Sequence, residues 1–281
     1  MHIDLKKEIK ESTTGRIGIS VLLLVILLAL LAPVLGRYNP VGQSTTTLLS
    51  PSCGHWLGTN HVGQDIWSQL LYGARTSLLV GFSVGILSLL FSILFGISTA
   101  LIGRVYDCVV MRIVDAFIII PTVIVAILVA AYVKPSLFLL IIILSVLSWP
   151  AGARVIRAQT LSLKQSGHIS ASRTFGASQL YIAWRHILPD LVPILLVEFI
   201  YGVRRAVFME AGLAFLGIGD PMVVSWGTMM HDALRFSYLD VWRWWLVPVG
   251  VALSLTIIGL TFISHAVESI IDPRLRGETV A

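Results

Sequence analysis

The sequence predicts an all-α membrane protein with about six transmembrane helices. Of its 281 residues, 56% are hydrophobic and only 12% are charged, about half of the roughly 25% found in soluble domains. The apolar residues are gathered into runs that approach the ~20 residues a helix needs to cross ~30 Å of hydrocarbon. Because no water reaches that depth, each run must satisfy its own backbone hydrogen bonds, and helix is the expected form.

Six apolar runs can be assigned as spans. They cover residues 17–35, 77–101, 113–133, 137–155, 191–212 and 246–265. The first run follows a basic segment but exceeds the roughly 7–15 residues of a signal-peptide core, so we interpret 17–35 as a retained first transmembrane helix. The remaining divisions are an N-terminal segment 1–16, an external loop 36–76, a transmembrane core 77–265 and a C-terminal tail 266–281.

The distribution of basic residues predicts the orientation of these spans. Cytoplasmic loops of membrane proteins carry an excess of Lys and Arg. With both termini placed in the cytoplasm, most basic residues fall on the cytoplasmic side, and the external segments hold only Arg37, Arg75, Lys134, Arg235 and Arg243. We therefore expect a multi-pass cell (inner) membrane protein with both termini in the cytoplasm. The net charge of +5 does not indicate nucleic acid, because the basic residues lie between apolar runs and form no single soluble face.

Two external segments are aromatic. Residues 64–72 place apolar side chains at helical spacing, which predicts a short helix lying at the membrane interface. The tryptophans at 242, 244 and 245 are interpreted as an aromatic belt that anchors the last span. The two cysteines, Cys53 and Cys108, fall on opposite predicted sides of the membrane and are not expected to pair.

Motifs for catalysis are absent from the sequence. The glycine-rich stretch at 212–219 is followed by no Lys-Ser/Thr pair, so it is no phosphate loop. Neither an H-E-x-x-H motif nor a G-x-S-x-G elbow occurs. His55 and His61 share the external loop and could hold a metal together, but solvated loop histidines are commoner. We expect a non-catalytic chain that binds no cofactor or metal itself.

The fifth span carries ionisable residues, each of which costs a few kcal/mol at the bilayer centre. Glu198 and Arg205 are seven residues apart, so they share one helix face, and with Glu210 they are candidates for lining a water-filled pathway. The alternative is that the arginines snorkel or pair inside the bundle, and the role of Arg204 stays open. In the second span, Gly81 and Gly85 form a G-x-x-x-G step that permits close helix packing.

The 157–190 connection is predicted to be a compact cytoplasmic docking loop. Its pattern indicates two short helices separated by Gly176, with Ser178 capping the second. Small residues at 170–172 leave a helix surface that can seat closely in a groove of another protein.

The spacing in this loop resembles the EAA loop of binding-protein-dependent ABC importer permeases. Ala171, Gly176, Leu188 and Pro189 fit the motif, whereas Ser170 and Ser172 replace its Glu and second Ala. Further matches to the peptide/nickel group lie at 56–65, 72–78, 185–189, 210–219, 225–227 and 272–275. Within the first of these, Asn60 replaces Asp and Gln64 replaces Arg. The segment 264–268 departs from the run usual in the group.

The resemblance implies the C-type permease of a dipeptide, oligopeptide or nickel ABC importer, with a type I importer fold and a cytoplasmic coupling helix. It implies a related second permease subunit, two cytoplasmic ATPase subunits that bind ATP and Mg²⁺, an extracytoplasmic solute-binding protein and the lipid bilayer as partners. The ATPase-docking residues would be Ser170, Ala171, Ser172, Arg173, Gly176, Leu188 and Pro189.

Two other classes are less well matched. A secondary transporter would show internal repeats with interrupted midplane helices, and a channel would show a re-entrant filter or pore-lining rings. Neither pattern is evident. For the substrate, the arginine pair of the fifth span favours a peptide carboxylate, and the external histidines leave nickel or a metal chelate as a close second.

Overall fold

The computed structural model describes residues 12–271 of the chain, with side chains described to residue 268. The predicted end segments 1–16 and 266–281 and the motif at 272–275 therefore lie partly or wholly outside the described residues. The described residues form, in chain order, α2 (Thr13–Leu30), α3 (Ala32–Leu35), α4 (Ile66–Ile102), α5 (Arg104–Ile119), α6 (Thr122–Tyr132), α7 (Leu137–Leu163), α8 (Gly167–Thr174), α9 (Gln179–Ile182), the π-helix η1 (Ala183–Ile187), α10 (Leu188–Phe215), α11 (Trp226–Arg235), the 3₁₀-helix η2 (Asp240–Arg243) and α12 (Leu246–Ile271).

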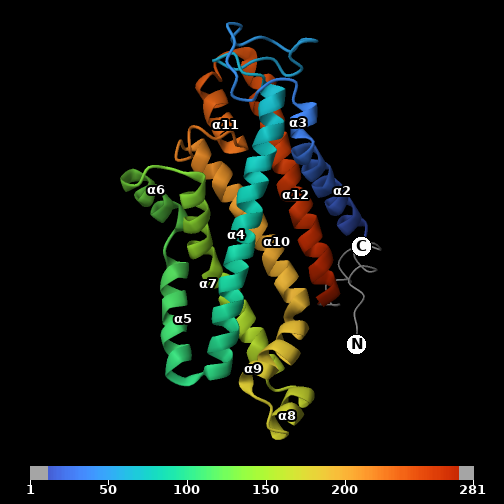
Figure 1. Ribbon diagram of the computed structural model, residues 1–281, viewed down its shortest axis with the longest axis vertical. Coiled ribbons are helices and arrows are strands. Elements are labelled where there is room, and N and C mark those ends of the chain that lie inside the picture. The colour runs from blue at the N-terminus through green and yellow to red at the C-terminus, as the bar shows by residue number, and fades with distance from the viewer. Residues whose placement is uncertain (1–11, 272–281) are drawn as a thin grey trace.

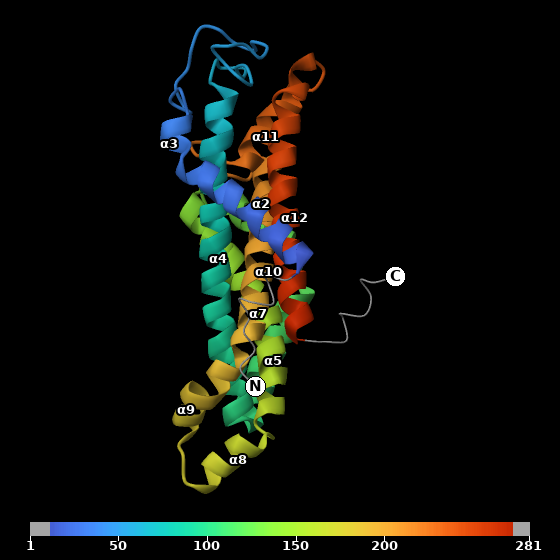
Figure 2. The same cartoon turned by 90° about the vertical axis from the view of Figure 1, so that its right-hand side faces the viewer.

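The long helices run side by side along the longest axis of the molecule. Figure 1 shows α4, α7, α10 and α12 in this direction, with the 36–65 connection at one end and α8 at the other. α4 packs most extensively against α7 and α10, while α2 crosses α12 obliquely (Figure 2). Within residues 12–271, five helices are long and apolar enough to span a membrane, or six if α5 and α6 count as one span. The all-α prediction with about six spans is confirmed.

The predicted third span at 113–133 is not a continuous helix. α5 already begins at Arg104, and α5 and α6 meet at an angle of 82°. Pro121 explains the break, because it offers no backbone N–H and disfavours helical geometry in the residue before it. Ile120 and Pro121 both adopt extended backbone angles, with ψ of 122° and 116°.

α4 is longer than the predicted second span. It contains 37 residues, and its first turns include the segment for which a separate interfacial helix is predicted. Asp65 caps this start by accepting a hydrogen bond from the Ser68 amide at 2.8 Å. Trp67 Nε1 donates to the carbonyl oxygen of Leu35 at 3.1 Å, so the start of α4 is tied to α3. The helix therefore continues without a break from the outer loop into the bundle.

The predicted close packing at Gly81 and Gly85 is confirmed. A Cβ on Gly81 would lie 2.5 Å from Val207, and one on Gly85 would lie 2.7 Å from Val203. Both contacts are shorter than real Cβ contacts, so only glycine lets α10 approach α4 this closely.

The aromatic belt prediction is wrong for Trp245. Its side chain is fully buried and stacks with the rings of His61 and Phe236, at centroid distances of 5.9 and 6.2 Å. It belongs to an apolar cluster with Trp226 and Ile66, which joins the 36–65 connection to α11 and α12.

Candidate functional site

A polar cavity lies between α4, α7 and α10. Its volume is about 120 Å³, and it is lined by Ser88, Leu89, Ser92, Ser148, Ala151, Gly152, Glu198, Tyr201, Gly202 and Arg205. Most of the wall consists of small side chains, and its functional groups are one carboxylate, one guanidinium, one phenol and three serine hydroxyls.

α10 brings Glu198 and Arg205 to this cavity. Seven residues correspond to about two helical turns, so both side chains leave α10 on the same face. Arg205 donates to Thr122 Oγ1 at 3.3 Å, at the start of α6. Among the described residues, no ion pair joins Glu198 to Arg205 or to any other base. Neither side chain therefore has an oppositely charged partner among these residues.

Small residues allow the three helices to converge around the Glu198 carboxylate. A Cβ on Gly152 would lie 2.7 Å from Ser92 Oγ and 3.2 Å from Glu198 Oε2. Ser92 Oγ lies 2.8 Å from the carbonyl oxygen of Trp149, to which it can donate across the α4–α7 contact. Gly152 is thus the residue of α7 that leaves room for the carboxylate.

Arg204 does not line the cavity, although it precedes Arg205. Its NH1 group donates to Thr261 Oγ1 on α12 at 3.1 Å, and its guanidinium lies 4.7 Å from the centroid of the Tyr201 ring. The Tyr201 hydroxyl in turn contacts the Glu268 carboxylate of α12. Arg204 and Tyr201 therefore connect α10 to α12 through polar contacts.

The third pathway candidate, Glu210, lies away from the cavity. Its side chain is 2% exposed, and Oε2 accepts a hydrogen bond from Ser77 Oγ at 2.9 Å. Ser77 Oγ also lies 3.4 Å from the amide nitrogen of Trp226, the first residue of α11. In this structure Glu210 joins α4, α10 and α11 instead of facing an open space.

The 157–190 connection folds as predicted into two short helices with a glycine between them. α8 ends at Thr174, and Gly176 takes a left-handed conformation with φ of +84°. The amides of Gly176 and Ala177 donate to the carbonyl oxygens of Arg173 and Ser172, which is the Schellman arrangement. Ser178 then caps α9 by accepting a hydrogen bond from the Tyr181 amide at 3.2 Å.

The docking candidates lie mainly on the surface of α8. Ser170, Ala171 and Arg173 are exposed, whereas Ser172 is half-buried. Leu188 and Pro189 are the first residues of α10, so they connect the loop directly to the helix that carries Glu198 and Arg205.

Two histidines hold α8 against η1 and the start of α10. His168 Nε2 lies 3.1 Å from Asp190 Oδ2, and Ser172 Oγ lies 3.3 Å from His186 Nε2. Beside them, Lys164 Nζ donates to the carbonyl oxygen of Ala100 at the end of α4. Burial, together with the Arg173 charge, lowers the pKa of Lys164. The loop is therefore attached to both α4 and α10.

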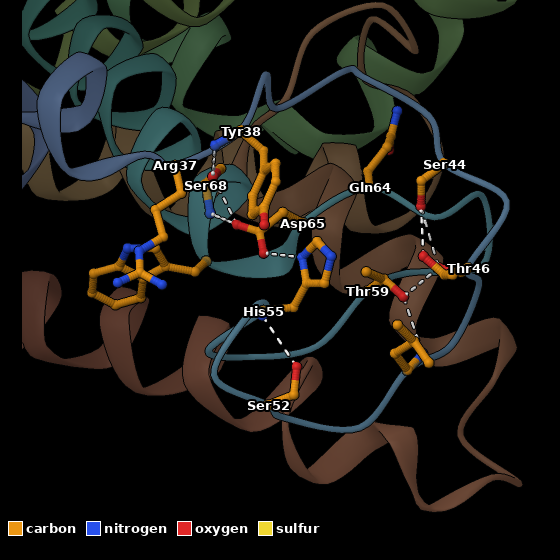
Figure 3. A network of polar contacts seen from close by, with 12 residues as sticks. Arg37, Tyr38, Ser44, Thr46, Ser52, His55, Thr59, Gln64, Asp65 and Ser68 are labelled. Atoms are coloured by element: carbon orange, nitrogen blue, oxygen red, sulfur yellow. Dashed lines mark hydrogen bonds and ion pairs between the residues drawn. The ribbon is translucent and has the colours of Figure 1, made fainter.

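At the opposite end of the molecule, the 36–65 connection is held by a polar network (Figure 3). His55 Nδ1 lies 2.8 Å from Asp65 Oδ1, and the His55 ring stacks on Tyr38 at 4.7 Å. The second predicted metal candidate, His61, instead stacks on Phe236 at 5.0 Å. Among the described residues, no group of three or more His, Cys, Asp or Glu could hold a metal ion.

Comparison with known proteins identifies the family. The model of the family described as "binding-protein-dependent transport system inner membrane component" matches residues 92–277, which is more than half of the chain. The chain belongs to this family.

This permease has relatives over nearly its whole length. A putative peptide transport system permease protein of Brucella suis is 36% identical over 265 residues, covering 94% of this chain and 88% of the relative. The oligopeptide permease OppC of Bacillus subtilis is 33% identical, covering 95% and 88%, and the dipeptide permease DppC of the same organism is 32% identical, covering 97% and 86%.

The fold is likewise that of a permease. An inward-facing structure of the MetNI methionine ABC transporter superposes with a TM-score of 0.56 at 22% identity, covering 71% of this chain and 96% of the other. The expectation of a type I importer fold is confirmed by this likeness.

Sequence reasoning missed much of the cavity wall of the permease. Ser88 and Ser92 of α4, and Gly152 of α7, line it together with Tyr201. The four-residue spacing of the two serines indicates one helix face. What the sequence does not specify is that this face meets Gly152 of another helix.

Proposed function

We propose that this permease forms half of the translocation pathway of an ATP-driven importer of short peptides. The family membership and the peptide-permease names of relatives that match 86–88% of their length support this proposal. The cavity between α4, α7 and α10 supports it independently, through its chemistry.

The observation that carries the proposal is the pair of unpaired charges in the cavity. A peptide with free ends is a zwitterion, so Glu198 suits its ammonium group and Arg205 suits its carboxylate. Positions seven residues apart on a helix are separated by about 10 Å along the axis. An extended tripeptide spans about 10 Å as well. The spacing of the two residues along α10 therefore matches the length of an extended tripeptide.

Energy would reach this pathway through the 157–190 connection. Ser170, Ala171 and Arg173 of α8 present the surface for a partner ATPase, and Leu188 and Pro189 pass its movement into α10. In this proposal the permease itself binds no cofactor, and two ATPase subunits bind and hydrolyse ATP with Mg²⁺. Docking need only change the relative stability of two conformations by a few kcal/mol to switch them.

The remaining partners are a related second permease, which supplies the other half of the pathway, and an extracytoplasmic solute-binding protein above the 36–65 connection. Both termini then lie in the cytoplasm, as the distribution of basic residues predicts. No nucleic acid takes part.

No observation on the structure favours nickel over peptide as the substrate. His55 is occupied with Asp65 and Tyr38, and His61 with Phe236. We therefore propose peptide as the substrate, and the uptake test below also distinguishes nickel from peptide.

The test is ATP-driven uptake of a labelled tripeptide by the assembled transporter in proteoliposomes. Glu198→Leu and Arg205→Leu should each reduce uptake per assembled complex about ten-fold or more, because each removes a charged hydrogen-bond partner of the substrate. Arg204→Leu is the control for loss of a positive charge from α10, since Arg204 contacts Thr261 and the Tyr201 ring but does not itself line the cavity. Its uptake per assembled complex should fall much less than that of Arg205→Leu. Wild-type uptake by both cavity variants, or uptake of nickel in place of the peptide, would contradict the proposal.

A further inference from the structure

An apolar groove lies between the last three turns of α4 and the junction of α9 with η1. Its volume is about 290 Å³, and its walls are almost wholly apolar. Ile97 forms part of the buried floor, whereas Leu180 and Trp184 on the rim are 69% and 67% exposed. A contiguous apolar surface of this kind marks a site that meets the membrane or a partner.

The groove continues the outward face of α4. Ile86, Leu90 and Leu94 are exposed at four-residue spacing, and this stripe runs directly into the groove at Leu94. Ser88 and Ser92, two positions away from Leu90, line the polar cavity instead. Two residues correspond to a rotation of about 200° around a helix, so the groove and the cavity lie on opposite sides of α4. The groove therefore opens towards the bilayer and away from the pathway.

One end of the groove carries a basic side chain. A recess of about 440 Å³ adjoins it, shares Leu180 and Trp184 with it, and adds Tyr181 and Arg185. Arg185 is exposed and, among the described residues, has no carboxylate within 4.0 Å. Trp and Tyr are enriched where membrane hydrocarbon meets water. The recess thus has the composition of a headgroup site beside a hydrocarbon site.

We propose that the groove and the adjoining recess bind one anionic phospholipid. An acyl chain lies along Leu94 and Leu180, the phosphate is held by Arg185, and the Trp184 indole lies at the boundary between the two. In the orientation proposed above, this lipid belongs to the cytoplasmic leaflet, where anionic headgroups attract basic residues.

The position of the loop separates this site from ATPase docking. α8, which carries Ser170, Ala171 and Arg173, forms the far end of the molecule, while α9 lies nearer to the end of α4 (Figures 1 and 2). The lipid would fill the space between loop and bundle and leave the α8 surface free. This inference does not depend on the substrate of the transporter.

The proposal can be tested by native mass spectrometry of the full-length chain, titrated in detergent with phosphatidylglycerol or phosphatidylcholine. The wild-type chain should bind phosphatidylglycerol about five-fold more tightly than phosphatidylcholine, as expected for one basic residue near an anionic headgroup. Arg185→Gln and Arg185→Glu should remove this preference. Ala183→Phe should weaken the binding of both lipids, because the larger side chain fills the groove. Arg173→Glu, an equal charge change on α8, is the matched control and should keep the preference.

Equal retention of the two lipids by the wild-type chain, or loss of the preference in Arg173→Glu, would overturn the proposal. A photo-crosslinker placed at Leu180 in the assembled transporter gives a second readout. Adducts with phospholipid would support the site. Adducts with an ATPase or with the second permease, and none with lipid, would show that a protein covers the groove and would overturn it.

Discussion

Ser77 Oγ donates a hydrogen bond to Glu210 Oε2 at 2.9 Å, across 133 residues of sequence. The contact joins α4 to α10 at a buried position beside the start of α11. It gives Glu210 a structural role in the bundle.

Replacement of Glu210 should therefore affect stability in a way that depends on hydrogen bonding. Glu210→Leu leaves Ser77 without its acceptor and should lower the free energy of unfolding by about 1–3 kcal/mol. Glu210→Gln keeps an acceptor oxygen and should cost less. Thermal unfolding of the purified chain in detergent measures both, and equal losses in the two variants would contradict this role.

Asn60 and Gln64 form a second testable pair. Asn60 Nδ2 donates to Gln64 Oε1 at 2.8 Å, and Asn60 is 1% exposed. The motif of the peptide/nickel group has Asp and Arg at these two positions. The two residues that differ from the motif are therefore in contact with each other. Asn60→Asp alone places an acceptor against an acceptor, and Gln64→Arg alone places a donor against a donor.

Each single substitution should therefore cost about 1–3 kcal/mol, and the double variant should recover most of this loss. A double-mutant cycle on thermal unfolding measures the coupling. Additive losses would show that the two positions vary independently.

Gly176 should be required for backbone conformation and not for packing. Its φ is +84°, and nothing lies within 4 Å of a Cβ built there. Gly176→Val should disturb the end of α8 and reduce ATP-driven uptake, because a β-branched residue disfavours positive φ. Gly176→Asn tolerates this conformation and should retain most uptake. Loss of uptake in both variants at normal assembly would indicate that side-chain size at the docking surface matters instead.

The native cysteines provide a topology test. Cys53 and Cys108 are both exposed, and they lie on opposite predicted sides of the membrane. A membrane-impermeant maleimide should label Cys53 in intact cells and Cys108 only after permeabilisation. Single-cysteine variants at 173 and 238 provide a second pair. The cysteine at 238 should be labelled in intact cells, and the one at 173 only after permeabilisation. Labelling of both native cysteines from outside would refute the orientation.

Much of the fold could be predicted from the sequence because membrane spans and caps are local features. Apolar runs locate α7, α10 and α12, and the Gly176 stop and Ser178 cap follow from backbone chemistry alone. The bend at Pro121 is also local in origin. The angle of 82° between α5 and α6 is not local in origin, because it depends on the helices against which α6 packs.

The candidate site was predictable only in part. The face shared by Glu198 and Arg205 follows from helical periodicity. The burial of Glu210 follows from its contact with Ser77, and the orientation of Arg204 from its contact with Thr261 on α12. These contacts join residues far apart in the chain, so no local pattern encodes them.

The unbroken length of α4 has a mechanical consequence. Its 37 residues make a rod about 55 Å long, nearly twice the ~30 Å thickness of the hydrocarbon layer. One end is fixed to the outer loop through the contact of Asp65 with His55, and the other contacts the docking loop through Lys164. A tilt of about 5° would displace the far end by about 5 Å over this length. A movement of α4 at one side of the membrane would therefore displace its end at the other side.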